Sequence, residues 1–375
     1  MRFMCNKFWL EKAINAAVKG AAKKSSYIWY EKIKIAARNG RATVTGFNSE
    51  LCVTADIPGA EIIEDGSCLI DHDGIVKALK KLPDDSLTLE FEPVEGTGSL
   101  NMKLGKFSLT VTAWVDENVY PEMPVVDSQP RIKVSAQELK KAIEGTRFAV
   151  SSNQGRPIMC GCWFGEDDGK LAVVGCDGYR LAVCWVSAVM NTFEPFVIKG
   201  EHLKELVGIL GKKDSNVVIA ADDKYCSFTV DEVTIVSRLL GGGYLDWKKV
   251  IDKRGYLEAT VEKSDFRDSL ERVSVVKDKK SPSMKLQFLG KELTFETSEY
   301  FGKVSDRCDI KTYDNLNVDV WCNPNYLADA IKYVPESQLR VMVKDRLSPV
   351  YFVGDEYLYE VLPINKRKRG SDSDN

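Results

Sequence analysis

The stretch GTRFAVSSNQGRPIMCGCWFGEDDGKLAVVGCDGYRLAVC, residues 145–184, is the part of this chain that decides the fold. It begins with the end of an amphipathic helix and passes into a polar segment at 151–156. The helix is predicted because its inward-facing residues recur three or four positions apart. These residues are Leu139, Ala142, Ile143 and Thr146.

The second half of the stretch is typical of an antiparallel meander. Two short runs of β-type residues, 159–164 and 170–174, are joined by the turn-rich segment 165–169. Asp177-Gly178 forms a tight turn, and a further strand leaves it at 179–183. We therefore expect a helix that lies on an antiparallel sheet.

Arg180 follows this turn, next to the apolar residues of the last strand. Such a place can hold the apolar side chains of a peptide while the guanidinium group binds its polar groups. The alternative is an ordinary Asp-Gly hairpin with a solvated arginine. The spacing alone does not distinguish the two.

Composition indicates an ordinary soluble globular protein. The 375 residues are 44% hydrophobic and 29% charged, which predicts two or three domains. No apolar run approaches the roughly 18 residues of a membrane span, and the N-terminus lacks a signal-peptide core. We therefore expect a cytoplasmic protein with no membrane partner.

The cysteines and histidines do not indicate a catalytic or metal centre. The ten cysteines follow no disulfide framework, which suits reduced, buried thiols. Cys160 and Cys162 form a C-x-C pair, for which core packing is favoured over metal or redox use. The two histidines, His72 and His202, are far apart, and residues 208–213 lack the spacing of a phosphate loop. We predict no cofactor, no metal and no catalytic residue.

One pattern returns at a period of roughly 125 residues. A first helix unit occurs at 8–18, 136–148 and 264–276. A second unit, with a strand, a helix, a polar turn and a strand, occurs at 69–91, 197–220 and 320–343. β-rich segments with alternating patterns lie between them. The fold class is therefore α+β, with helices on antiparallel sheets, used three times.

The domain borders are expected where this periodicity stops. Proline-bearing segments at 120–124 and 127–130 close the first domain, and 251–255 separates the second from the third. A charged tail rich in Ser and Asp follows, and we expect it to be disordered. The predicted division is 1–126, 130–251, 254–364 and the tail 365–375.

Basic residues concentrate in the segments chosen as helix units. Residues 8–24, 74–83, 136–147, 199–213, 264–280 and 325–335 hold 20 Lys and Arg against 10 Asp and Glu. The remainder holds 32 against 45. One interpretation is a basic helical surface that faces phosphates, with acidic sheets outside. The other is a set of ordinary solvated helix faces.

Three motifs together point to a family. Thr146-Arg147-Phe148-Ala149, Arg156-Pro157 and Asp177-Gly178-Tyr179-Arg180-Leu181-Ala182, in this order, resemble the middle domain of the bacterial DNA polymerase III beta subunit, the sliding clamp. The resemblance runs from Met1-Arg2-Phe3 to Val361-Leu362-Pro363-Ile364.

This resemblance implies a processivity factor without enzymatic activity. Family members are head-to-tail homodimers, with six similar domains in a ring that encloses duplex DNA and slides without reading sequence. The implied partners are duplex DNA, a DNA polymerase, a clamp loader, other proteins with a clamp-binding motif and a second copy of the chain. Phosphate contacts, which carry no sequence information, suit this role.

Two alternatives remain open. One is a clamp-derived monomeric interaction or regulatory module that binds replication proteins without encircling DNA. The other is an enzyme that uses a thiol, although no cysteine has a nearby histidine in the sequence.

The resemblance also implies site residues. By motif position the DNA-facing residues are Lys24, Asn153 and Arg156, and Lys199 and Lys204 are added from their place on a basic helix. For each, a merely solvated side chain is the alternative.

A partner-peptide pocket is implied between the second and third domains, and an apolar domain junction is its alternative. Its residues are Met159, Cys176, Gly178, Tyr179, Arg180, Leu181, Leu245, Lys249, Val250, Asn323, Tyr326, Leu347, Val361, Leu362, Pro363 and Ile364. Leu245, Tyr179, Lys249 and the polar Glu360 before Val361 depart from the family pattern.

The dimer contact is expected to join Phe107 and Leu109 of the first domain to Val275 and Val276 of the third domain in the partner copy. The tail cluster Lys366-Arg367-Lys368-Arg369 extends beyond the usual end of the family. It is interpreted as an additional DNA contact, a nuclear-localisation-like cluster or a solubilising tail.

Overall fold

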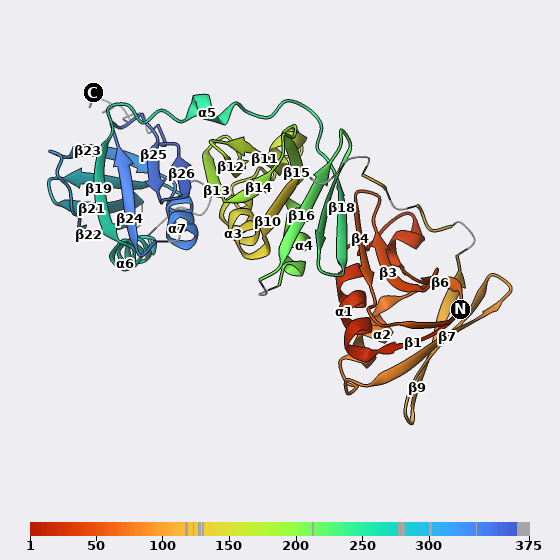
Figure 1. Cartoon of the computed structure of the whole chain (residues 1–375). Coiled ribbons are helices and arrows are strands. Elements are labelled where there is room, and N and C mark those ends of the chain that lie inside the picture. The colour runs from red at the N-terminus through yellow and green to blue at the C-terminus, as the bar shows by residue number, and fades with distance from the viewer. Residues whose placement is uncertain are drawn as a thin grey trace. The chain divides into compact units, whose positions relative to one another are not determined.

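The computed structural model describes residues 1–116, 119–122, 124–126, 129, 131–211, 214–276, 282–299, 302–334 and 336–365 (Figure 1). The predicted tail, apart from its first residue, lies outside these described residues. They pack into two compact units, 1–140 with 187–240, and 141–186 with 241 onward. No helix in the described part of the chain is long and apolar enough to cross a membrane.

The first unit is built on one fourteen-stranded antiparallel sheet. Its strand order is β14-β10-β16-β17-β18-β4-β3-β2-β6-β9-β8-β7-β1-β5. The strands are β1 (Arg2–Asn6), β2 (Ile33–Arg38), β3 (Arg41–Phe47), β4 (Leu51–Asp56), β5 (Glu61–Glu64), β6 (Gly66–Ile70), β7 (Ser86–Val94), β8 (Thr97–Leu104), β9 (Phe107–Val115), β10 (Ile132–Ser135), β14 (Ala188–Met190), β16 (Asn216–Ala221), β17 (Tyr225–Val230) and β18 (Val233–Arg238). The other elements are α1 (Lys7–Ala17), η1 (Ile28–Glu31), α2 (His72–Leu79), β15 (Phe196–Lys199) and α4 (Gly200–Ile209), and α3 (Ala136–Arg147) runs from the first unit into the second.

The second unit contains two antiparallel sheets. One runs β11-β12-β13-β26-β25-β24-β19 and the other β22-β21-β20-β23. The strands are β11 (Gly161–Asp167), β12 (Lys170–Cys176), β13 (Arg180–Val186), β19 (Leu257–Glu262), β20 (Met284–Leu289), β21 (Glu292–Glu299), β22 (Gly302–Asp309), β23 (Asn317–Cys322), β24 (Gln338–Val343), β25 (Val350–Val353) and β26 (Tyr357–Val361). The helical elements are η2 (Pro157–Cys160), α5 (Trp247–Val250), α6 (Lys263–Val273) and α7 (Pro324–Tyr333).

The predicted repeat of helix units is confirmed. The three first units form α1, α3 and α6, and the three second units contain α2, α4 and α7, each between two strands. Helices α1 and α2 contact each other, as do α6 and α7 (Figure 1). The predicted α+β class, with helices on antiparallel sheets, is therefore correct. One detail differs, since Met159 lies in the turn η2 and the strand begins only at Gly161.

Two strand ladders run across the predicted domain borders. Strand β18 pairs with β4, which joins the predicted second domain to the first. Strand β13 pairs with β26, which joins the second to the third. Backbone hydrogen bonds make these junctions part of continuous sheets. The division into three domains stays a prediction, because contacts group the chain differently.

Two glycines allow a helix to approach a strand at backbone contact. A Cβ atom on Gly46 would lie 1.9 Å from the carbonyl oxygen of Ala17 at the end of α1. A Cβ atom on Gly175 would lie 2.1 Å from the carbonyl oxygen of Thr146 near the end of α3. Neither distance is sterically possible, so both positions require glycine. The same close approach therefore recurs in two copies of the repeat.

The core of the second unit lies where α6 and α7 pack on its sheets. Phe266 on α6 contacts Phe295 with ring centroids 5.0 Å apart, and Phe352 at 5.9 Å, both edge to face. All three rings are fully buried. Aromatic pairs of this geometry stabilise a core beyond the area that they bury.

Burial shifts the pKa of several thiols and of one histidine. The ten cysteines form no disulfide within the described residues. Burial raises the pKa of the thiols of Cys5, Cys52 and Cys162 to about 12. The ring of His202 is buried, its Nδ1 lies 2.8 Å from the Ser237 hydroxyl, and burial lowers its pKa to about 4. These groups are therefore uncharged near neutral pH.

Candidate functional site

Arg180 lies at the centre of a polar cluster of the second unit. Its Nε donates to a carboxylate oxygen of Asp177 at 3.0 Å, and its Nη2 donates to the carbonyl oxygen of Phe148 at 2.9 Å. Its Nη1 donates to Asp329 on α7. The guanidinium also lies 4.4 Å from the ring centre of Tyr326. Arg180 thus ties three distant segments together.

These contacts change the role expected for Arg180. Three of its five N–H donors bind within the chain, and its side chain is 16% exposed. Burial raises the pKa of Asp329 despite the neighbouring guanidinium. A guanidinium that binds a peptide and a solvated arginine were the two alternatives from the sequence; here three donors of Arg180 bind within the protein, and the role toward a peptide stays a prediction. One partner of Arg180, Asp329, lies 149 positions later in the chain, and no local pattern in the sequence indicates this contact.

The C-terminal segment runs beside the turn that precedes Arg180. The backbone N–H of Leu362 donates to the carbonyl oxygen of Tyr179 at 2.9 Å. The N–H of Ile364 donates to the carbonyl oxygen of Trp321 at 2.7 Å. The structure therefore brings together two groups of predicted pocket residues that lie about 180 positions apart in sequence.

Residues 244–252, which we call the strap, cross the same region and are held at three points. The Tyr244 hydroxyl donates to the carbonyl oxygen of Val174 at 3.2 Å. The buried Trp247 packs edge to face against Trp163 and Trp185, with ring centres 5.9 and 6.2 Å away. The N–H of Asp252 donates to the Tyr351 hydroxyl at 3.3 Å. The strap is thus held by aromatic residues.

Tyr244 and Trp247 were absent from the predicted pocket. Their side chains point inward while Leu245 and Val250 of the same segment remain 36% and 39% exposed. The aromatic pair three residues apart in GGGYLDWKKV is the sequence signal that would have indicated the anchors.

Most of the predicted pocket residues fall into an exposed set and a partly buried set. The exposed large apolar side chains are Tyr179, Leu245, Val250, Leu347 and Leu362, and we call them the rim. Gly178 and Lys249 are also exposed, and Lys249 Nζ lies 2.7 Å from an Asp246 carboxylate oxygen. The partly buried members are Met159, Arg180, Asn323, Tyr326, Pro363 and Ile364. Asn323 caps α7, because its side chain accepts from the N–H of Asn325 at 2.9 Å.

Cys176 and Leu181 are buried beneath this rim, whereas Val361 lies elsewhere. Val361 is fully buried in the core that α6 and α7 cover. That Val361 lines a pocket stays a prediction, although its side chain is buried here. Side chains alternate between the faces of a strand, so the neighbour Glu360 points to the face opposite Val361.

The residues predicted to bind DNA differ in exposure and in partners. Lys24, Asn153, Arg156 and Lys204 are exposed. Asn153 Oδ1 accepts from the N–H of Gly155 at 2.9 Å, which stabilises its own turn. Lys199 Nζ lies 3.0 Å from a Glu50 carboxylate oxygen, so its charge is already paired within the chain.

The basic surplus does not lie in the helices themselves. Within the described ranges, six helices have eight or more residues, and they hold 11 Lys and Arg against 10 Asp and Glu. The surplus comes from residues outside the helices: Lys199 precedes α4, whereas Lys19, Lys23, Lys24, Lys80 and Lys81 follow helix ends. The remaining contributors, Lys212, Lys213, Lys277, Lys279 and Lys280, lie outside the described residues. The predicted basic helices are therefore close to neutral, and cations after helix C-termini complement the helix dipole.

Several strand edges lack a partner within the described part of the chain, and those of β9 and β22 are two of them. Residues 107–112 of β9 pair only with β8, because β6 reaches only 113–115. Strand β22 pairs only with β21. Phe107 is 36% exposed on the first edge, and Val275, near the end of α6, is 75% exposed. Leu109 and Val276 are partly buried.

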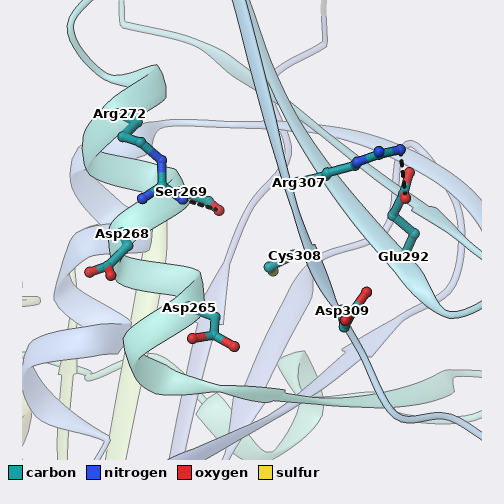
Figure 2. A pocket seen from close by; sticks show the side chains of 8 residues that line it. All are labelled: Asp265, Asp268, Ser269, Arg272, Glu292, Arg307, Cys308 and Asp309. Atoms are coloured by element: carbon teal, nitrogen blue, oxygen red, sulfur yellow. Dashed lines mark hydrogen bonds and ion pairs between the residues drawn. The ribbon is translucent and has the colours of Figure 1, made fainter.

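A polar hollow lies between α6 and β22 (Figure 2). Arg307 points toward Glu292 across neighbouring strands, with Nη1 3.1 Å from a carboxylate oxygen. Four acidic residues and two arginines line the hollow, with Ser269 and Cys308. The charged residues are Asp265, Asp268, Arg272, Glu292, Arg307 and Asp309. The region beside the open edge of β22 is therefore acidic on balance.

Comparisons with known proteins agree on one family. Residues 133–246 match the central domain of the DNA polymerase III beta subunit, and residues 248–362 match its C-terminal domain. The chain is 25% identical over 363 residues to a protein of Staphylococcus epidermidis named beta sliding clamp, with 93% of this chain and 94% of that protein covered. It is 25% identical over 364 residues to the beta sliding clamp of Halalkalibacterium halodurans, with the same coverage.

Solved structures show the same fold over nearly the whole chain. The DNA polymerase sliding clamp of Bacillus subtilis aligns with a TM-score of 0.90 at 23% identity. The DNA polymerase III subunit beta of Pseudomonas aeruginosa aligns with a TM-score of 0.90 at 19% identity. Each alignment covers 98% of this chain and 100% of the other.

Proposed function

Because this chain belongs to the DNA polymerase III beta subunit family, we propose that it is a DNA polymerase processivity factor without enzymatic activity. Two copies form a head-to-tail ring of six domains, with borders near 126–130 and 251–254 in each chain. The ring encloses duplex DNA and tethers a polymerase, and a clamp loader and other proteins with a clamp-binding motif share its surface. The curated relatives named beta sliding clamps support this proposal.

The observation that carries the proposal is the pair of unpartnered strand edges. Edge strands present free N–H and C=O groups, which pair readily with another chain. An edge on β9 of one copy and the edge of β22 in the next suit head-to-tail pairing, and a head-to-tail contact that closes forms a ring. Phe107 and Leu109 would then meet Val275 and Val276 of the second copy.

Charge complementarity supports the same pairing. The hollow beside β22 is acidic on balance, whereas Lys77 on α2 and Lys103 and Lys106 near the start of β9 are exposed. Opposite charges across an interface favour one partner and one register. The acidic hollow beside β22 and the lysines near β9 are therefore opposite in charge.

The proposed contact with DNA is electrostatic. Lys24, Arg156 and Lys204 are the exposed cations among the predicted DNA-facing residues, and Asn153 lies in the same loop as Arg156. Lys199 has a smaller role, because Glu50 pairs with it. Phosphate contacts of this kind weaken with salt and do not depend on sequence, so a ring held by them slides.

The proposed partner pocket is the rim together with the groups beneath it. Exposed apolar side chains from four segments form the rim, and two of these segments are joined by the hydrogen bond from Leu362 to Tyr179, which suits a peptide-binding surface. The binding of partner peptides at this place gives the ring its tether.

Small-angle X-ray scattering tests the ring. We expect the mass of two chains and the distance distribution of a hollow particle. Phe107→Asp should give single chains, because a charge at the open edge opposes pairing, whereas Tyr313→Asp at a fully exposed position should leave the mass unchanged. A wild-type mass of one chain at micromolar concentration would favour the monomeric interaction module instead.

Retention on DNA tests the topology. Protein loaded on a nicked circular duplex should stay bound through gel filtration and should be lost once the circle is linearised, because a ring slides off free ends. Equal loss from both forms would contradict encirclement.

A further inference from the structure

Glu360 is a buried acid among apolar residues beneath the strap. It is 2% exposed and lies on β26 opposite Leu181 of β13 and Tyr351 of β25. Directly opposite residues of antiparallel strands share one face of the sheet. Leu181 and Tyr351 belong to the buried cluster that contains Cys176 and the strap anchor Trp247. The carboxyl group therefore faces this cluster.

Neither carboxyl oxygen of Glu360 has a hydrogen-bond partner within the described residues. Burial, with a smaller contribution from Glu360, raises the pKa of the Cys176 thiol on β12, of the Tyr351 hydroxyl on β25 and of the Tyr256 hydroxyl after the strap. The hydroxyl of Tyr244 in the strap donates a hydrogen bond to the carbonyl oxygen of Val174 and is therefore not turned to Glu360. None of these groups is a cation, and the Lys249 ammonium pairs with Asp246.

An unpartnered carboxyl group is costly at such a place. Burial raises the pKa of Glu360 from 4.5 to about 7, so a substantial fraction carries charge near neutral pH. A buried charge without a partner is destabilising, and a donor or cation that reaches it removes that penalty. A ligand that supplies such a donor or cation therefore binds more tightly, because its binding removes this penalty.

Glu360 lies close in sequence to one of the rim residues. Leu362 lies two residues after Glu360, so it points to the same face of the chain, and it is 36% exposed. The strap covers the cluster, and the exposed run Gly241, Gly242 and Gly243 precedes it. No atom lies within 4 Å of a Cβ built on any of these glycines, so the start of the strap is not packed against the protein.

We propose that Glu360 makes the pocket select partner peptides that carry a lysine or arginine among their apolar anchors, with that cation bound to the Glu360 carboxylate. This inference rests on the proposed function, in which the pocket binds peptides. The aliphatic stem of the cationic residue packs among the rim residues, and its charged end reaches the acid. An apolar anchor at the same place leaves the carboxyl group buried and unpaired.

Peptide binding to the full-length protein tests the selection. The probes are fluorescent peptides with leucine and phenylalanine anchors, in which each anchor is replaced in turn by lysine or by norleucine, which has a similar length without the charge. The protein variants are wild type, Glu360→Gln, Glu360→Val and the exposed control Glu258→Gln. Circular dichroism and thermal melting establish that each variant is folded.

For one anchor position, the wild type should bind the lysine peptide at least about tenfold more tightly than the norleucine peptide. Glu258→Gln should keep this preference, Glu360→Gln should lose most of it, and Glu360→Val should reverse it. The preference should grow from about pH 6 to about pH 8, because the acid ionises in this range while lysine stays charged.

The outcomes separate this inference from the proposed function. If the ratio of affinities for the lysine and norleucine peptides is the same in wild type and Glu360→Val at every anchor position, Glu360 does not select the peptide, although the pocket binds peptides. The selection by Glu360 is also wrong if the wild type binds the norleucine peptide more tightly at every anchor position. If no variant binds any peptide, the pocket itself is wrong, and the selection falls with it.

Discussion

The hydroxyl of Tyr357 donates a 2.8 Å hydrogen bond to the carbonyl oxygen of Gly145, 212 residues earlier in the chain. Gly145 lies in the last turns of α3, where backbone carbonyls begin to lack helical partners. A Cβ atom on Gly145 would lie 3.2 Å from the tyrosine ring. The absent side chain therefore lets the ring pack on the helix, and β26 is held to α3.

Tyr357→Phe removes only this hydroxyl. Because the bond is buried, the Gly145 carbonyl oxygen loses its partner, and we expect the free energy of unfolding to fall by about 1–3 kcal/mol. Urea denaturation measures this change. Tyr313→Phe, at a fully exposed ring, is the control and should have no effect. Equal stability of the two variants would show that the hydroxyl has no net role.

Arg180→Lys keeps the positive charge but loses the planar fork that binds Asp177, Asp329 and the Phe148 carbonyl. A lysine cannot satisfy three acceptors in that geometry, so we expect a loss of about 2 kcal/mol in the free energy of unfolding.

Arg254→Lys is the matched control for this change. Arg254 also pairs with an aspartate, Asp252, but its side chain is 90% exposed. Because solvent weakens such pairs, its replacement should leave urea denaturation unchanged. Similar losses in both variants would mean that burial of Arg180 does not matter.

Trp247→Ala removes the central anchor of the strap. The indole is buried between Trp163 and Trp185, so its loss leaves a cavity and should cost about 3 kcal/mol. Limited proteolysis should also cut residues 244–252 faster than in the wild type. Leu245→Ala, in the same segment but 36% exposed, is the control, and equal protease resistance of Trp247→Ala and wild type would contradict the anchor.

The buried acid predicts a specific pH dependence of stability. The pKa of Glu360 is about 7 in the fold against 4.5 ordinarily, so the folded state keeps a proton that the unfolded chain releases between these values. The protonated Glu360 therefore contributes to the free energy of unfolding. This contribution is fully present below about pH 4.5 and is lost as pH rises through 7, and the loss is about 3 kcal/mol.

Glu360→Gln should therefore gain stability relative to the wild type as pH rises from about 5 to about 8, and urea denaturation at several pH values measures this difference. Glu258→Gln, at an exposed position, should show no such trend. A constant difference between Glu360→Gln and wild type would mean that Glu360 titrates as an exposed carboxyl group.

The sequence alone determined the repeat of helices and strands, the α+β class and the family, because these depend on local periodicity and on motifs within short segments. It also indicated the segments that meet near Arg180, although that expectation came from resemblance. It did not determine the partners of Arg180 or the strand ladders that join β18 to β4 and β13 to β26. Segments far apart in the chain make these contacts, and no spacing encodes them.

The tertiary structure alone decided which face each pocket residue occupies. Val361 enters the core and Glu360 faces the strap cluster, because the pairing of β26 with β13 sets the alternation of its side chains. Likewise, only the observed helix bounds show that the excess of Lys and Arg over Asp and Glu lies outside the helices, mostly in residues that follow helix ends. A one-residue change in register reverses a side chain's face, and local sequence does not specify register between strands about 180 residues apart.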